Sequence, residues 1–227
     1  MDRRRFLAAA ATAAGLRAAD SKQKLLLPSD DPDDLKFRLM WYSPVPAIDV
    51  QSYRLRIGGL VEKPLDLAAA DLRRLPQVKQ NSRMKCVQCW SARTDWGGFR
   101  FETLLDLVKP RKSAKAVRFD CADKWFEYMS LEDMISPRVL LALDMAGKPL
   151  ADRHGAPLRL IDPSRYGYKC AKLIVSATFV TEGKGSMACD LGPYYSPEGK
   201  IQPGYDHPLD LASKEKRKIS GGEILEY

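Results

Sequence analysis

Cys86 is the residue whose type and surroundings most directly suggest chemistry. It lies in residues 84–91, MKCVQCWS, ahead of an aromatic and glycine-rich stretch at residues 96–99, WGGF, which we interpret as a loop. Two later segments, 154–159 (HGAPLR) and 165–169 (RYGYK), supply imidazole, guanidinium and ammonium groups among glycines. A thiolate is a soft metal ligand, and cations beside accessible backbone amides bind anions. The combination indicates a soft metal held on an anionic organic cofactor.

Cys89 gives the same segment a second interpretation. Two residues separate it from Cys86, which is the spacing of dithiol redox centres whose attacking thiol has a lowered pKa. Half of a zinc site is another reading, but the sequence contains neither a second Cys-x-x-Cys nor a His-x-x-x-His. The count of five cysteines is odd, so at least one stays unpaired or binds a ligand. Thiol–disulfide chemistry therefore stays open as an alternative, and burial of Cys89 as a small side chain is the simplest account of that residue.

The two later segments have the composition of an anion-binding site. Gly155 and Gly167 permit close backbone approach or positive φ. Arg159 can bind a phosphate bidentately, and Lys169 supplies a compact positive charge. Taken singly, each motif also fits a turn histidine or a surface arginine. Their order after Cys86 favours one shared site.

Together these motifs resemble the molybdopterin domain of the sulfite oxidase family, over about residues 50 to 180. The chain is most similar to the exported branch that includes the catalytic subunit of periplasmic methionine-sulfoxide reductase. The resemblance implies an α+β fold of the sulfite-oxidase type, with mixed sheets and short helices. It also implies a molybdenum-molybdopterin cofactor (Mo-MPT), with Cys86 as metal ligand and catalytic residue. The cofactor-binding residues that it implies are Cys121, His154, Arg159, Gly167, Tyr168 and Lys169.

The resemblance further implies the type of reaction. We expect a two-electron oxygen-atom transfer, in the direction of reducing an S-oxide or N-oxide, with oxidation of a sulfur compound as the reverse possibility. The segment 40–46, MWYSPVP, lacks the arginine, asparagine and histidine found there in sulfite oxidases, which disfavours sulfite. Two histidines and no Cys-x-x-Cys-His make a haem improbable, so electrons must pass to or from a separate haem membrane protein, cytochrome or quinol system. A noncatalytic pterin-binding scaffold is the second alternative.

The N-terminus has the pattern of an export signal. Residues 1–19 begin with adjacent arginines and Phe6-Leu7, continue with an alanine-rich run, and end in small residues. The pattern predicts a twin-arginine signal peptide and a periplasmic location, with a disordered basic tail or a short amphipathic helix as the alternative. The apolar run is shorter than the roughly 20 residues needed to cross a bilayer, so we expect no transmembrane segment. The net charge of +8 comes partly from this signal, and no basic stripe interleaved with aromatics predicts a nucleic-acid partner.

The rest of the chain divides into an arm and one domain. Residues 20–50 mix charge with prolines and form an N-terminal arm, and residues 51–227 form the domain, with a wrapping tail from about 181. Alternating or β-branched patterns predict strands, and capping residues and prolines delimit short helices. Strands are expected at 52–61, 116–121, 139–145 and 173–180, and helices at 67–75, 101–108 and after Ser130. The irregular order of helices and strands favours α+β. Trp90 and Trp96 are expected to wall the site entrance.

Overall fold

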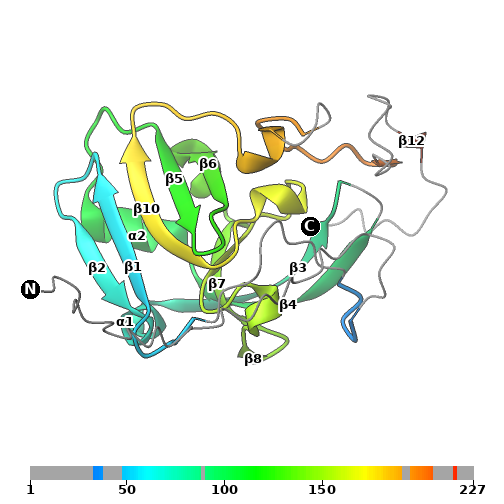
Figure 1. The fold of residues 1–227 in the computed structure, drawn as a ribbon, viewed down its shortest axis with the longest axis horizontal. Coiled ribbons are helices and arrows are strands. Elements are labelled where there is room, and N and C mark those ends of the chain that lie inside the picture. Colours follow the sequence, from blue (N-terminus) through cyan, green and yellow to red (C-terminus); the bar gives the residue numbers. More distant parts are fainter. Residues whose placement is uncertain (1–32, 38–47, 88–89, 191–194, 207–216, 219–227) are drawn as a thin grey trace, which may run out of the picture.

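A computed structural model describes residues 33–37, 48–87, 90–190, 195–206 and 217–218 of the chain. Two sheets form its body (Figure 1). The first has the strand order β2-β1-β10-β5-β6, with only β1 and β10 parallel. Its strands are β1 (Arg54–Gly59), β2 (Leu65–Ala68), β5 (Ala116–Cys121), β6 (Phe126–Ser130) and β10 (Ile174–Val180). The second sheet has the order β3-β4-β7-β8, with β9 paired to β7. Its strands are β3 (Gln77–Lys85), β4 (Ser91–Phe99), β7 (Leu140–Met145), β8 (Lys148–Pro149) and β9 (Arg159–Ile161).

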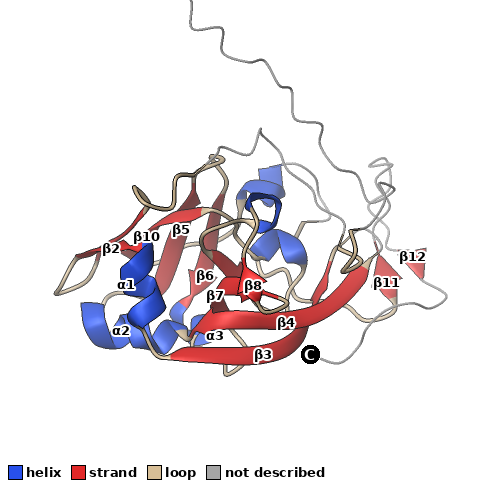
Figure 2. Cartoon of the chain, turned by 90° about the horizontal axis from the view of Figure 1, so that it is seen from below, coloured by secondary structure: helices blue, strands red, loops and turns tan. Residues whose placement is uncertain are grey.

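The helices are short and lie beside the first sheet. They are α1 (Ala69–Arg74), α2 (Phe101–Val108) and α3 (Leu131–Met134), and Figure 2 shows them on the side of that sheet that faces β3 and β4. Three 3₁₀ turns are η1 (Asp152–His154), η2 (Gly167–Lys169) and η3 (Met187–Asp190), and β11 (Tyr205–Asp206) pairs with β12 (Arg217–Lys218). The predicted α+β class with mixed sheets and short helices is confirmed. None of the helices in the described part of the chain is long and apolar enough to span a membrane.

Where the sequence pattern is strong, the elements lie close to the predicted positions. In β1, Leu55 and Ile57 are buried and Arg54 and Arg56 are exposed, as the alternation of a half-buried strand requires. The α2 helix has the predicted bounds, and its first residue, Phe101, packs against Phe119 and Phe179 of the first sheet. Ser130 caps α3 as expected, because its Oγ accepts a hydrogen bond from the amide of Asp133 at 3.0 Å.

The interpretation of residues 96–99 as a loop is wrong. These residues belong to β4, which pairs with β3 in a long antiparallel hairpin from Gln77↔Phe99 to Lys85↔Ser91. Gly98 lies at a register shift between β4 and β7, where a Cβ would come 2.1 Å from the carbonyl oxygen of Leu141. The glycine is therefore a requirement of close strand pairing. This hairpin carries the residue singled out first, because Cys86 follows directly after β3.

Candidate functional site

Cys86 lies at the end of the β3–β4 hairpin, beside the turn that contains Gly167. The amide of Cys86 donates to the carbonyl oxygen of Trp90 at 2.8 Å, which closes the hairpin. Lys85 forms a parallel bridge with Tyr166, and a Cβ at Gly167 would lie 3.4 Å from the Lys85 carbonyl oxygen. Cys86 is partly exposed, and none of the four cysteines in the described part of the chain forms a disulfide. Two of the three sequence motifs therefore meet at this point.

Arg159 brings the third motif to the same place. It begins β9, which pairs with β7, and β7 pairs with β4. The guanidinium donates to the backbone oxygen of His154 at 2.8 Å and to the sulfur of Met84 at 3.5 Å, two residues before Cys86. Its carbon lies 5.2 Å from the ring centre of Trp96, in cation–π contact. Burial lowers the pKa of Arg159 to about 10, and its Nε has no protein partner within the described residues.

The prediction that Trp96 lines the entrance of the site is wrong. The same prediction for Trp90 agrees better with the structure. Trp96 is fully buried, and its indole nitrogen donates to the Ser82 carbonyl oxygen at 3.3 Å. The Trp96 ring packs against the Arg159 guanidinium, because β4 directs the Trp96 side chain into the core. Trp90 is only partly buried and contacts Phe37 edge to face, with ring centres 5.7 Å apart.

Lys172, which lies outside the three sequence motifs, belongs to this cluster. It comes just before β10, and the adjacent Leu173 amide donates to the Gly155 carbonyl oxygen at 3.2 Å. Gly155 has φ +94°, and a Cβ there would lie 2.7 Å from the Lys172 Cβ, so this contact requires glycine. The Lys172 side chain keeps some solvent exposure. Burial of its ammonium, and then the charge of Arg159, lower its pKa to about 7, while Asp123, Cys121 and Cys86 oppose that shift.

Cys121 occupies the end of β5, where the first sheet reaches the cluster. Ile174 pairs with Cys121, and the amide of the next residue, Ala122, donates to the Leu173 carbonyl oxygen at 2.9 Å. Cys121 is buried, and burial followed by the charge of Asp123 raises the pKa of its thiol. It lies close enough to Lys172 to influence the pKa of that ammonium. The structure thus places Cys121 near Lys172, as a neutral thiol.

The side chains of Tyr168 and Lys169 are directed elsewhere. The Lys169 ammonium forms an ion pair with Glu127 and donates to the carbonyl oxygens of Tyr128 and Pro197 at 2.9 and 2.8 Å. The Tyr168 hydroxyl donates to the Ser196 carbonyl oxygen at 2.8 Å. Both side chains therefore hold the segment that follows η3 against η2. The expected contact of Lys169 with a cofactor phosphate finds no counterpart in these bonds, since protein acceptors surround its ammonium.

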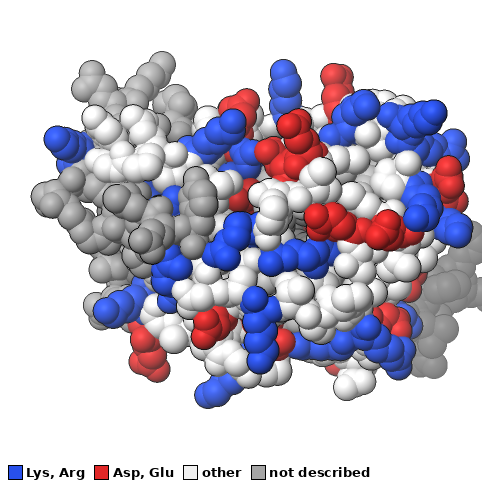
Figure 3. All heavy atoms as spheres, turned by 180° about the vertical axis from the view of Figure 1, so that it is seen from behind, with Lys and Arg blue, Asp and Glu red and all other residues white. Residues whose placement is uncertain are grey.

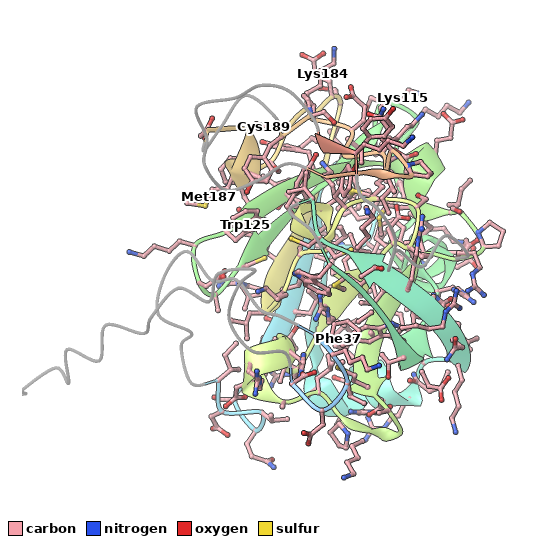
Figure 4. The ribbon with its side chains drawn as sticks, turned by 90° about the vertical axis from the view of Figure 1, so that its right-hand side faces the viewer. Phe37, Lys115, Trp125, Lys184, Met187 and Cys189 are labelled. Atoms are coloured by element: carbon pink, nitrogen blue, oxygen red, sulfur yellow. The ribbon has the colours of Figure 1, made fainter. Side chains whose placement is uncertain are left out.

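His154 lies beside Arg159 at the far side of the cluster from η3. It is 7% exposed, and its Nε2 lies 3.0 Å from Asp33 Oδ2. Its Nδ1 is buried and has no protein partner within the described residues. Burial, and then the charge of Arg159, lower the pKa of His154 to about 4, against the opposing effect of Asp33. Phe37 packs on it, and Figure 4 shows Phe37 well away from Met187 and Cys189 of η3.

These groups fit an anionic ligand that also donates hydrogen bonds. Arg159 and Lys172 are cations whose pKa values are lowered by burial, so a bound anion would stabilise their charged forms. The unpartnered Nε of Arg159 is a donor, and the unpartnered Nδ1 of neutral His154 is an acceptor. A phosphorylated heterocycle carries both kinds of partner. On the face shown in Figure 3, basic and acidic side chains are interspersed.

The cationic cluster predicts that Lys172→Met stabilises the chain when no cofactor is bound. Replacing a charge held in a poor environment by an apolar side chain of similar length should add about 1 to 4 kcal/mol to the free energy of unfolding. The folded-state pKa of about 7 lies below the unfolded value of 10.5, so between these values the unfolded chain binds more protons. The advantage of the variant should therefore shrink as the pH rises above 7.

Urea unfolding of cofactor-free wild type and Lys172→Met at several pH values between 6 and 9 measures this difference. Lys184→Met, which changes an exposed lysine, is the matched control and should leave stability unchanged. A Lys172→Met variant that is less stable than the wild type at pH 7 would show that the ammonium is well accommodated without a ligand.

A family model described as the oxidoreductase molybdopterin binding domain matches residues 42–187. The chain is 31% identical over 178 residues to the protein-methionine-sulfoxide reductase catalytic subunit MsrP of Campylobacter jejuni, covering 70% of this chain and 60% of that protein. It is 39% identical over 137 residues to the putative protein-methionine-sulfoxide reductase subunit YedZ1 of Azospira oryzae, covering 60% and 52%.

A solved structure has the same fold. The sulfane dehydrogenase SoxCD from Paracoccus pantotrophus superposes with a TM-score of 0.60 at 18% identity, over 88% of this chain and 57% of that one. This chain spans between half and two thirds of the length of each of these relatives.

Proposed function

The chain belongs to the family of oxidoreductase molybdopterin-binding domains, and from that premise we propose that it is an exported enzyme that reduces S-oxides. The resemblance to sulfite-oxidase-type molybdopterin enzymes is confirmed, and with it the prediction of an oxidoreductase. The substrate, the direction of the reaction, the electron partner and the location are parts of the proposal. The similarity to two relatives named as methionine-sulfoxide reductases favours an S-oxide over an N-oxide.

The observation that carries the proposal is the convergence of Cys86 with Arg159 and Lys172. Three separate segments of the chain bring one partly exposed thiol and two cations of lowered pKa to one place. Arg159 and Lys172 would hold the anionic part of molybdopterin, and Cys86 would be the protein ligand of the metal. When bound, the molybdenum cofactor would supply the two-electron exchange of an oxygen atom with the substrate.

The surrounding residues orient the ligand and restrict water. Trp96 supports the Arg159 guanidinium from below, and Gly155 allows the His154 turn to approach Lys172 closely. At Gly167, η2 packs against the carbonyl of Lys85 next to Cys86. Phe37 and Trp90 cover one side with apolar rings, which lowers the local dielectric and strengthens the charge interactions inside. These residues define the geometry before any ligand arrives.

The electron partner and the location rest on separate support. We propose a haem membrane protein, cytochrome or quinol system as the partner, because two histidines without a Cys-x-x-Cys-His offer no haem site of the attached kind. We propose a periplasmic location through the twin-arginine route from the sequence of residues 1–19, which lie outside the described residues. Residues 38–47, including the segment that lacks the substrate-binding arginine of sulfite oxidases, also lie outside them.

A substrate comparison tests the proposed activity. The protein, purified from a host that makes molybdopterin, would be given a reduced viologen dye with methionine sulfoxide, free and in a peptide, or with trimethylamine N-oxide. We expect the dye to be oxidised with the S-oxides and much more slowly with the N-oxide. Oxidation of sulfite, with ferricyanide as the electron acceptor, tests the opposite direction of the reaction. Protein that contains the cofactor but turns over none of these compounds would favour the noncatalytic scaffold instead.

A further inference from the structure

A short piece of the N-terminal arm contacts the site directly. Residues 33–37, which we call the N-terminal strap, lie far from His154 in sequence, yet Asp33 reaches its imidazole. The side chain of Phe37 is fully buried. Its ring contacts His154, Trp90 and Trp96 edge to face, with centres 6.1, 5.7 and 5.7 Å apart. The strap is therefore packed into the wall of the site.

The two carboxylate oxygens of Asp33 have different partners. Oδ1 accepts hydrogen bonds from the amides of Leu35 at 2.9 Å and Phe37 at 2.8 Å, which shapes the strap. Oδ2 lies 3.0 Å from His154 Nε2. Since an ionised carboxylate only accepts hydrogen bonds, Nε2 must carry the proton in this contact. Asp33 thus links the fold of the strap to the protonation of the ring.

The other ring nitrogen of His154 is left without a partner among the described residues. Nδ1 is buried and has no protein partner within the described residues. Burial and the charge of Arg159 lower the pKa of His154 to about 4, so the ring is neutral at pH 7. A neutral ring with its proton on Nε2 has a lone pair on Nδ1 and accepts one hydrogen bond there. Leaving a buried acceptor without a donor costs free energy, so the site is incomplete until a donor arrives.

We propose that Asp33 is a positioning residue that fixes the Nε2–H tautomer of His154, so that Nδ1 accepts a hydrogen bond from an N–H group of the bound pterin. This rests on the proposed function only in naming the ligand as a pterin. A phosphate dianion or a thiolate donates no hydrogen bond, so neither satisfies Nδ1. The heterocycle, with its amino and ring N–H groups, is the part of the cofactor that does. His154 therefore faces the heterocycle, and Arg159 and Lys172 face the anionic parts.

Nitrogen NMR of the cofactor-free full chain labelled with ¹⁵N-histidine reads the tautomer directly. The chain has two histidines, His154 and His207, and a His207→Gln variant assigns the spectrum. We expect the wild-type His154 ring to carry its proton on Nε2 at pH 7. In Asp33→Asn, the amide oxygen can keep capping the strap while the amide nitrogen turns a donor toward Nε2. We therefore expect the proton to move to Nδ1. Asp34→Asn, an exposed neighbour with the same change in charge, should leave the ring unchanged.

Pterin retention is the second readout. In protein loaded with cofactor, Asp33→Asn should release pterin about tenfold faster than the wild type, because Nδ1 no longer accepts its hydrogen bond. Fluorescence of the oxidised pterin after gel filtration measures the loss, and Asp34→Asn should match the wild type. A wild-type ring protonated on Nδ1, or Asp33→Asn protein that keeps its pterin, would overturn the proposal. Wild-type protein that never contains pterin would instead contradict the proposed function, whatever the tautomer.

Discussion

Cys86→Ser should lower S-oxide turnover by more than about a hundredfold while leaving the fold intact. Loss of even the outer partners of a metal ligand costs about ten- to a hundredfold in affinity or activity, and loss of the ligand itself should cost more. A serine hydroxyl is a hard donor of nearly the same size, so it removes the soft ligand and little else. Cys86 follows directly after β3, is partly exposed, and is not among the buried residues of the core clusters in the described part of the chain.

The expected pattern across three measurements separates this account from its rival. In Cys86→Ser, we expect lost turnover and reduced molybdenum content, with pterin content reduced less, because Arg159 and Lys172 are unchanged. Cys89, which lies outside the described residues, supplies the matched control. Cys89→Ala should keep nearly full activity. Equal damage from both substitutions would favour thiol–disulfide chemistry, and full activity in Cys86→Ser would remove the metal-ligand assignment.

Lys169→Met should destabilise the folded chain by about 3 to 5 kcal/mol, because it leaves Glu127 buried without its cation. Glu127 is fully buried, and burial raises the pKa of its carboxyl to about 8 although Lys169 opposes the shift. Without Lys169, ionising that carboxyl costs still more. The folded-state pKa of Glu127 then lies still further above the unfolded value. Below about pH 8 the carboxyl is protonated in both folded proteins, so the deficit should grow as the pH rises above about 8, where only the wild type ionises it.

Urea unfolding of cofactor-free protein measures the effect apart from any ligand. The double variant Lys169→Met with Glu127→Gln should recover most of the lost stability, since no unpaired charge remains. Lys112→Met, at an exposed position, is the control. If Lys169→Met were as stable as wild type and lost only pterin, the ammonium would serve the cofactor, as the sequence motif suggested, and the ion pair with Glu127 would be of little consequence.

The strands and helices that the sequence predicted share a strong local signal. An alternation of apolar and polar residues, a run of β-branched residues or a proline after the last turn marks β1, α2 and β5 in the sequence itself. The β3–β4 hairpin lacks such a signal, because β3 reads QVKQNSRMK and about half of its polar residues are buried by neighbouring segments. Ser82 and Arg83 are both fully buried there. Their burial depends on tertiary contacts, which no local pattern reveals, so the glycines of β4 were interpreted as a loop.

The sequence was sufficient to predict which segments meet at the site. It was not sufficient to predict which way each side chain points. The order of the motifs placed Cys86, His154 and Arg159 in one site, and the structure brings these segments together. Lys169 and Lys172 are three residues apart, and only the path of the chain through η2 into β10 decides which one lies beside Arg159. The contact between Asp33 and His154 could not be predicted from the sequence, because nothing in the arm indicates which residue Asp33 contacts.

Molybdenum and pterin content is the most direct test of the central claim, that this chain holds molybdopterin through Cys86. The wild type would be purified from a host that makes the cofactor and exports through the twin-arginine route, then analysed by metal analysis and by fluorescence of the oxidised pterin. The account predicts near-equal amounts of molybdenum, pterin and protein, with the molybdenum lost in Cys86→Ser. Folded wild-type protein without metal or pterin from that host would contradict it.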